Sequence, residues 1–203
     1  MTVEPRPFRL PLLPTLIVAA AVAAMIALGI WQLHRAQWKE ALIARYAHAA
    51  TQPPIAFPTA PFAGDPPLYR YATGNCLEVV ARRAIAGESR SGEPGYSHIV
   101  SCRTGAEGPG MAVDIGWSKN PNAAIGWKGG LVSGIIAPDR VARMRLVADG
   151  AAPGLQPSAK PSLDSIPNNH RSYAVQWFLF AAVALTVYVI ALRRRPTAMP
   201  PKP

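Results

Sequence analysis

The stretch NNHRSYAVQWFLF, residues 168–180, places a histidine directly before an apolar run. A neutral imidazole is a common axial ligand to haem iron, and His170 supplies one. Aromatic side chains at Tyr173, Trp177 and Phe178 would offer the macrocycle an apolar wall. This interpretation makes His170 a candidate iron ligand where the apolar run begins.

The same stretch has a second interpretation that needs no ligand. A histidine at the start of a membrane helix can be an ordinary interfacial residue, with Asn168 or Asn169 capping the helix. Tyr173 and Trp177 would then form the aromatic belt at the membrane surface. The residue types alone allow both interpretations and favour the interfacial one.

His34 and Arg35 extend this chemistry to the other half of the chain. His34 lies four residues beyond an apolar run that ends at Ile30, and His170 lies three residues before the second run. In an antiparallel helix pair both imidazoles would lie near one membrane plane, so a bis-histidine site is geometrically possible. Arg35 can pair with a haem propionate through charge-assisted hydrogen bonds, or with a lipid phosphate.

Cys76 and Cys102 are the only cysteines, and their spacing of 26 matches no metal-binding or thioredoxin-like motif. Soft copper ions favour clustered Cys, Met and His ligands. A structural disulfide in an oxidising compartment, or two unpaired thiols, are therefore each favoured over a copper site.

Motifs of common enzyme classes are missing from the sequence, which contains no GxxxxGK[ST], HExxH or GxSxG. Asp114 stands alone in a β-rich run and could be a catalytic acid, but we expect a solvent-facing carboxylate. The sequence therefore predicts a protein that is not an enzyme.

Two uncharged apolar runs must position the residues of the predicted site. Residues 12–30 and 173–192 are each close to the ~20 residues that a helix needs to cross a bilayer core. Residues 21–23 resemble a signal-peptidase site, but this site lies inside the apolar run. We therefore expect an uncleaved anchor and a chain that crosses the membrane twice.

Basic residues predict the orientation, because lysine and arginine near helix ends resist translocation. The termini hold six of them, including the cluster at 193–195. We expect both termini in the cytoplasm and residues 31–172 in the periplasm. An abundance of Arg, Ala, Gly and Pro is typical of GC-rich bacterial genomes, so we expect a bacterial inner membrane.

The formal net charge of +10 divides equally between the short tails and residues 31–172. No basic stripe is interleaved with aromatic residues. The charge therefore reflects membrane topology, and the predicted partners include membrane lipid but no nucleic acid.

Between the membrane runs the sequence predicts one β-rich domain. Six short β-rich runs separated by turn signals lie at 68–74, 76–83, 97–104, 110–117, 131–137 and 140–148. The predicted fold class is a membrane protein in which two transmembrane helices flank one extracytoplasmic, mainly antiparallel β domain, as a sheet or small barrel.

The remaining segments connect these parts. They are a helical extension at 31–50, a proline-rich connector at 51–67, the β-rich domain at 68–149, a second connector at 150–172, and cytoplasmic tails at 1–11 and 193–203.

Three stretches resemble motifs of one protein family. They are LGIWQLHRAQWKEALI at 28–43, GMAVDIGWSKNP at 110–121 and NNHRSYAVQWFLFA at 168–181. In this order they resemble the end of the first membrane helix, the central strand and the start of the second membrane helix in the Surfeit locus protein 1 family. Together they span nearly the whole chain.

The resemblance implies a function. The family assists the biogenesis of haem-copper terminal oxidases, chiefly cytochrome c oxidase, and bacterial members are implicated in binding haem a and delivering it to oxidase subunit I. We therefore expect haem a as a transient cofactor, with His170 as its iron ligand. Subunit I and haem a synthase are the expected partners.

The motifs also assign roles to other residues. His170 and Arg35 match a motif histidine and arginine, whereas His34 occupies a variable position. The expected haem-binding residues are His170, Tyr173, Trp177, Arg35 and His34, and the structural motif residues are Gly29, Trp31, Gln32, Gly116 and Trp117. The family commonly has Asn-Arg where this chain has Asp114-Ile115, so no role of that arginine carries over.

Two of these structural positions have a physical explanation. We expect Gly29 to allow close packing of the helices. Trp117 beside Gly116 is interpreted as a core residue next to a close backbone approach, with a docking edge for the oxidase as the alternative.

Two rival functions remain open. A membrane scaffold could hold an oxidase assembly intermediate without touching haem. A two-helix sensor is disfavoured, because tails of 11 residues each are too short for an output domain.

Overall fold

The computed structural model describes residues 11–59, 64–106 and 110–194, which fall into two compact units. One unit contains the chain up to Ala41 and from Pro167 onward, and the other is Leu42–Ile166. Nearly all of both predicted tails, residues 1–10 and 195–203, lies outside the described residues.

Helix α1 (Leu12–Thr51) is continuous over 40 residues. Pro14 lies in its first turn, where a missing N–H costs no intrahelical bond. The helix ends before Pro53 and Pro54, because proline has no N–H to donate and disfavours helical geometry in the residue before it.

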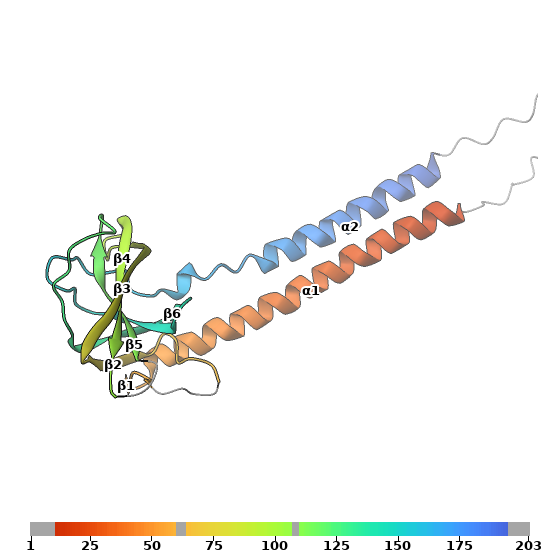
Figure 1. The fold of residues 1–203 in the computed structure, drawn as a ribbon. Helices are drawn as coiled ribbons and strands as arrows, with labels where there is room; N and C mark the ends of the chain where they lie inside the picture. The colour runs from red at the N-terminus through yellow and green to blue at the C-terminus, as the bar shows by residue number, and fades with distance from the viewer. Residues whose placement is uncertain (1–10, 60–63, 107–109, 195–203) are drawn as a thin grey trace, which may run out of the picture. The chain divides into compact units, whose positions relative to one another are not determined.

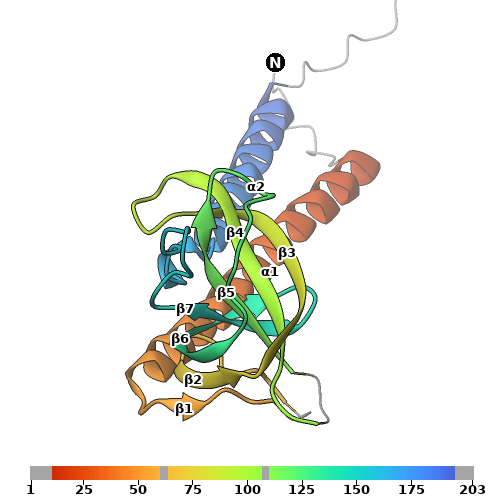
Figure 2. The same cartoon turned by 60° about the vertical axis from the view of Figure 1, so that its left-hand side comes forward.

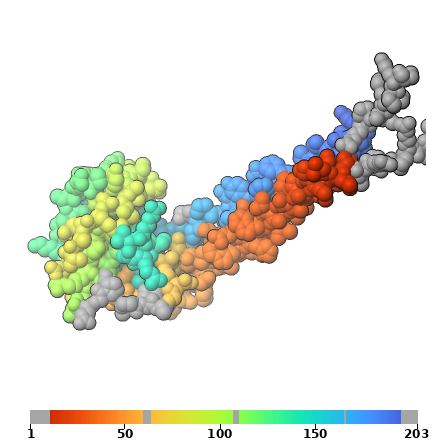
Figure 3. All heavy atoms as spheres, turned by 45° about the vertical axis from the view of Figure 1, so that its right-hand side comes forward, coloured from red at the N-terminus to blue at the C-terminus, as the bar shows by residue number. Residues whose placement is uncertain are grey.

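Helices α1 and α2 (His170–Arg193) are both long and apolar enough to cross a membrane. They lie side by side in Figures 1 and 3. The least exposed positions recur three or four residues apart, at Thr15, Val18, Val22, Met25, Gly29, Gln32 and Ala36 of α1 and at His170, Ala174, Trp177, Ala181, Ala184 and Tyr188 of α2. This is the spacing of two helices that pack along one seam.

Small side chains bring the two helix backbones together in this seam. Gly29 is buried, and a Cβ at this position would lie 2.6 Å from Cε1 of Phe178. The hydroxyls of Thr15 and Tyr188 form a hydrogen bond near the other end of the pair. An early residue of α1 thus contacts a late residue of α2, so the helices run antiparallel.

The second unit is a seven-stranded sheet (Figure 2). Its strands are β1 (Ile55–Ala56), β2 (Tyr71–Cys76), β3 (Glu78–Glu88), β4 (Pro94–Arg103), β5 (Met111–Ser118), β6 (Gly130–Asp139) and β7 (Arg143–Ala148), and a short 3-10 helix, η1 (Leu163–Ser165), precedes α2. Each of the six predicted β-rich runs overlaps one of the strands β2 to β7.

The sheet is mixed and open, so of the two expected forms the sheet is confirmed and the small barrel is wrong. The strand order is β1-β2-β6-β7-β5-β4-β3, with β1–β2 and β5–β7 parallel and the other neighbours antiparallel. β6 pairs with β2, and the turn after β6 returns β7 into the space beside β5. Among the described residues no pairing joins β3 to β1 or β2, so the sheet does not close.

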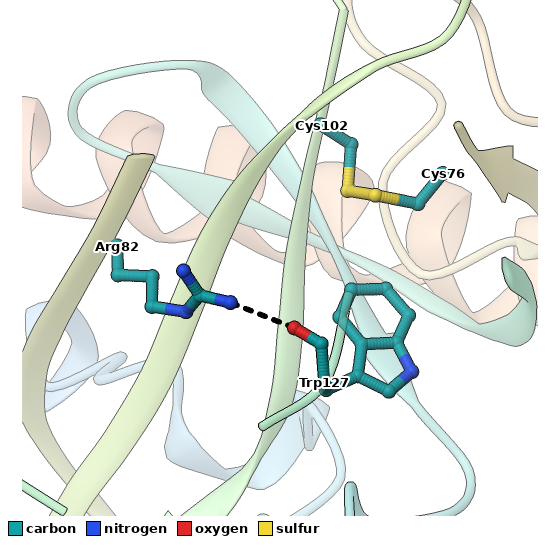
Figure 4. Close-up of a disulfide and its surroundings, with 4 residues drawn as sticks. All are labelled: Cys76, Arg82, Cys102 and Trp127. Atoms are coloured by element: carbon teal, nitrogen blue, oxygen red, sulfur yellow. Dashed lines mark hydrogen bonds between the residues drawn. A yellow bond between two sulfur atoms is a disulfide. The ribbon is translucent and has the colours of Figure 1, made fainter. Parts of the chain in front are cut away.

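A disulfide between Cys76 and Cys102 shows that the sheet is strongly curled (Figure 4). β2 and β4 are four strand spacings apart in the sheet order, or about 19 Å if the sheet were flat. The two Cα atoms are 5.2 Å apart. Of the alternatives left open for the cysteines, the structure therefore contains the bridge.

Arg82 on β3 forms a hydrogen bond to the long loop between β5 and β6, close to this disulfide. Its Nη2 donates to the carbonyl oxygen of Trp127 at 2.7 Å, as Figure 4 shows.

Trp117 on β5 is a core residue and is only 1% exposed. Its Nε1 donates to the carbonyl oxygen of Gly87 at 3.2 Å. Gly116 has φ +134°, and a Cβ there would lie 2.8 Å from the carbonyl oxygen of Gln156, so this position requires glycine. β5 lies between β7 and β4, so this motif is not at a sheet edge.

Asp114 on β5 is 2% exposed, so the expectation of a solvent-facing carboxylate is wrong. Its Oδ1 accepts hydrogen bonds from Ser158 Oγ at 2.6 Å and from the Gly116 N–H at 3.2 Å. Burial raises the pKa of Asp114, although these hydrogen bonds and the charge of Arg145 act in the opposite direction. The carboxyl is a satisfied structural group of the core.

A signal for this burial was present in the sequence. Met111–Ser118 is buried at every position before its last. A strand that is covered on both faces is apolar almost throughout, as GMAVDIGW is.

Candidate functional site

The central feature of the candidate site is the hydrogen bond between His170 and Gln32. His170 is the first residue of α2, and its Nδ1 lies 2.8 Å from Oε1 of Gln32 on α1. A carbonyl oxygen of an amide can only accept, so Nδ1 donates this bond. In the neutral ring the lone pair then belongs to Nε2, which is the nitrogen available to a metal.

This arrangement is typical of histidine that ligates a metal. Such histidines usually donate their second ring N–H to a carboxylate, a carbonyl or water, which holds the ring orientation and raises the basicity of the ligating nitrogen. Both residues lie on the seam of the helix pair and are half-buried. The donor set therefore fits an iron that is approached through Nε2.

The sequence motif predicted only a structural role for Gln32, and the pairing with His170 was not predicted. A signal existed, since both residues are polar, with Gln32 just after the first apolar run and His170 just before the second, so an antiparallel helix pair would place them at the same end. The partners are 138 residues apart in the chain, so only the helix pair could show that they meet.

The aromatic residues of α2 divide into two groups. Tyr173 and Trp177 follow His170 at helical spacing, and Tyr173 is 51% exposed. Trp177 is half-buried and contacts Phe180 edge-to-face, with ring centroids 6.1 Å apart. Phe178 also lies in the seam, where it packs on Gly29, and it does not share the open side of Tyr173.

The side-chain cap expected at the start of α2 is not formed, so that part of the interfacial interpretation is wrong. Asn169 is the N-cap residue and makes no side-chain capping bond. Oδ1 of Asn168 is buried, with no hydrogen-bond partner among the described residues. Asn169 has φ −90° and ψ 8°, which is not the extended geometry typical of an N-cap residue.

His34 and His170 are not brought together. His34 is exposed and lies two positions from Gln32, which is roughly 200° around the helix. The imidazole of His34 is therefore on another face of α1 from the seam that holds His170.

The basic residues near His170 have partners of different kinds. Arg35 is exposed, and its Cζ lies 4.5 Å from the ring centroid of Trp38. Arg171 forms an ion pair with Glu40, with Nε 2.8 Å from Oε1. The guanidinium of Arg35 stacks on an aromatic face and makes no hydrogen bond to the described residues, whereas Arg171 already faces a carboxylate.

Trp31 lies beside this site and is 55% exposed, as expected for an aromatic residue at a membrane surface. Within residues 11–59, 64–106 and 110–194, no three His, Cys, Asp or Glu side chains gather as a metal-binding group. Haem iron requires only one or two protein ligands, so a single histidine suffices for such a site.

The sequence was compared with known families and proteins. The SURF1 family model matches residues 19–182, which include all three motifs and both sides of the helix pair. No curated protein matches the chain at a significant level. Since the match covers most of the chain, the protein belongs to the Surfeit locus protein 1 (SURF1) family, which is linked to cytochrome oxidase assembly.

Proposed function

We propose that this protein is a non-enzymatic assembly factor that binds haem a through His170 and presents it to subunit I of cytochrome c oxidase. The observation that carries the proposal is the hydrogen bond from His170 Nδ1 to Gln32 Oε1, which leaves Nε2 as the ligating atom. Family membership supports the connection to the oxidase.

The surroundings of His170 suit an amphipathic cargo. Haem is a planar apolar ring with two propionates at one edge. Tyr173 and Trp177 offer aromatic surface one and two turns along α2, and the exposed guanidinium of Arg35 offers N–H donors for a propionate. A histidine at the membrane surface allows the ring to remain in apolar surroundings while its propionates meet water.

The carrier proposal is tested on the full-length protein purified from cells that make haem a. We expect a Soret band in stoichiometric amount, and loss of most of this band in His170→Ala at unchanged protein yield. His34→Ala is the matched control, since it removes an exposed imidazole of the same helix pair and should retain most of the haem.

Two results would contradict the carrier proposal. Equal haem content in wild type, His170→Ala and His170→Gln would show that the imidazole does not bind iron. A cofactor-free wild-type protein that still captures subunit I would favour the scaffold.

The proposed orientation places both termini in the cytoplasm and the sheet unit in the periplasm. Alkaline phosphatase fused after Gly92, in the exposed turn between β3 and β4, should be active, and a fusion after Lys202 should be inactive. The reverse pattern would place His170 and Gln32 at the cytoplasmic surface and would overturn the proposed route of haem delivery.

A further inference from the structure

A second candidate binding site lies wholly within the sheet unit. It is a pocket of about 520 Å³ between β3 and the β6–β7 hairpin, a volume suited to a small molecule. Its lining includes Arg83, Ile85 and Ala86 of β3, Asp139 and Arg140 of the turn, and Arg145 of β7. We call these residues the arginine pocket.

Cations outnumber anions in the arginine pocket. Three guanidinium groups, which remain protonated at all physiological pH values, face a single lining carboxylate, Asp139. Asp114 lies beneath the pocket, with Oδ2 3.9 Å from Nε of Arg145. Even with both carboxylates ionised, the three arginines leave a net positive charge.

The carboxylate of Asp139 has little capacity to accept further hydrogen bonds from the other arginines, because both of its oxygens are already used. Its Oδ1 accepts the N–H groups of Val141 and Ala142 at 2.9 and 2.8 Å. Its Oδ2 accepts Nη2 of Arg83 at 2.6 Å, with Nη1 of Arg145 at 3.8 Å. Although burial acts against ionisation, these donors lower the pKa of Asp139, so it is an anion at neutral pH.

The guanidinium groups retain unused donors. Each carries five N–H donors. Arg145 donates through Nη1 to the carbonyl oxygen of Pro138 at 2.6 Å, and its buried Nε, 3.9 Å from Asp114 Oδ2, makes no hydrogen bond within the described part of the chain. Arg140 is exposed and has no hydrogen bond or ion pair among the described residues.

The rest of the lining is apolar. Ile85 is half-buried and lies with Ala86 on the β3 side, opposite the turn that carries Arg140. A ligand that meets both surfaces needs an oxyanion at one end and an apolar body at the other. Arginine favours carboxylates, because its planar fork matches two carboxylate oxygens.

We infer that the arginine pocket binds a small amphipathic carboxylate, with its carboxylate on Arg140 and Arg145 and its apolar part on Ile85. The site is separate from His170 and does not depend on the proposed haem binding. Arg83 remains engaged by Asp139 and positions the turn.

The test uses the full-length protein in neutral detergent, with 4-fluorobenzoate followed by ¹⁹F line broadening. We expect saturable broadening with wild type and about tenfold weaker binding to Arg140→Gln, since one charge-assisted hydrogen bond is lost. Arg140 makes no contact that the fold requires, so this variant should keep the wild-type melting temperature.

Lys128→Gln is the matched control. Lys128 is an exposed cation of the β5–β6 loop outside the pocket, so its removal lowers the net charge equally and should not change binding. Equal affinities of wild type, Arg140→Gln and Lys128→Gln would overturn the site.

Competition identifies the chemistry of the ligand. Hexanoate should displace 4-fluorobenzoate at lower concentration than inorganic phosphate does. Phosphate that competes as well as hexanoate or better would overturn the carboxylate assignment, because the pocket would then respond only to anionic charge.

Discussion

The helix pair and the sheet unit differ in how far their buried polar groups are hydrogen-bonded within the fold. In the sheet, Asp114 is enclosed and accepts bonds from Ser158 and Gly116. In the helix pair, His170 is half-buried and uses one ring nitrogen on Gln32. A polar group whose bonding capacity is used within the fold is structural, whereas one that keeps a ligating atom free is a candidate for function.

The two regions also differ in the size of the side chains that they bury. The sheet unit buries Trp117 and is cross-linked by the Cys76–Cys102 disulfide. The helix pair buries only small residues such as Gly29 and Ala174, and most of its other apolar surface is exposed, which is typical of helices that cross a membrane. Substitutions of buried residues in the sheet unit should therefore change stability, whereas substitutions of polar residues in the helix seam should mainly change haem binding.

The largest effect on stability is expected for Trp117→Ala. Removing a fully buried indole leaves a cavity, and we expect the free energy of unfolding to fall by about 3–5 kcal/mol. The measurement is chemical denaturation of the full-length protein, followed by near-UV circular dichroism. Trp31→Ala is the control, and a comparable loss there would break the comparison between the two regions.

Loss of the disulfide should have the next largest effect. The double variant Cys76→Ser, Cys102→Ser should lose ~2–4 kcal/mol of stability, because the unfolded chain is no longer constrained. Oxidase assembly should persist at the growth temperature, since neither cysteine lies in the helix pair. A double variant that accumulates normally but assembles no oxidase would give the bridge a functional role.

Asp114→Asn should change how stability depends on pH. Because burial raises the pKa of Asp114, the folded state holds its proton more tightly than the unfolded state does. Stability therefore falls as pH rises from the unfolded pKa, about 3.9, through the raised folded pKa. The variant should lack this decline and be at least as stable as wild type at pH 7.

Asp149→Asn is the control with the opposite sign. Although burial acts against ionisation, hydrogen bonds from Tyr71 and Lys160 lower the pKa of Asp149. The ionised Asp149 carboxylate stabilises the folded state above the unfolded pKa, and this stabilisation is lost as pH falls through the lowered folded pKa. Denaturation between pH 3 and 8 should thus show opposite slope changes for the two variants, and equal slopes would contradict the assignment of Asp114.

The smallest effect on stability is expected at Gln32, with a change of roughly 1 kcal/mol or less for the loss of one hydrogen bond. Gln32→Leu should weaken haem retention, because the imidazole loses its orienting partner. Gln32→Glu should lower the reduction potential of bound haem, since a carboxylate makes the imidazole more basic. Unchanged spectra and potentials in both variants would show that Gln32 does not act on the site.

Much of the fold could be predicted because its signals are local. The apolar runs around Gly29 and Trp177 satisfy the length requirement of membrane helices, and β-rich runs between turn signals mark strands β2 to β7. Three motifs in order, of which the one around His170 is the last, indicated the family, which the match over residues 19–182 then showed.

The chain by itself determined these helices, strands and motifs, because hydropathy, periodicity and short motifs are properties of neighbouring residues. Tertiary structure alone decided which segments meet. It inserted β7 beside β5, curled the sheet until Cys76 met Cys102, and enclosed Asp114. It also placed Gln32 against His170, because a hydrogen bond between residues 138 positions apart depends on how two helices pack.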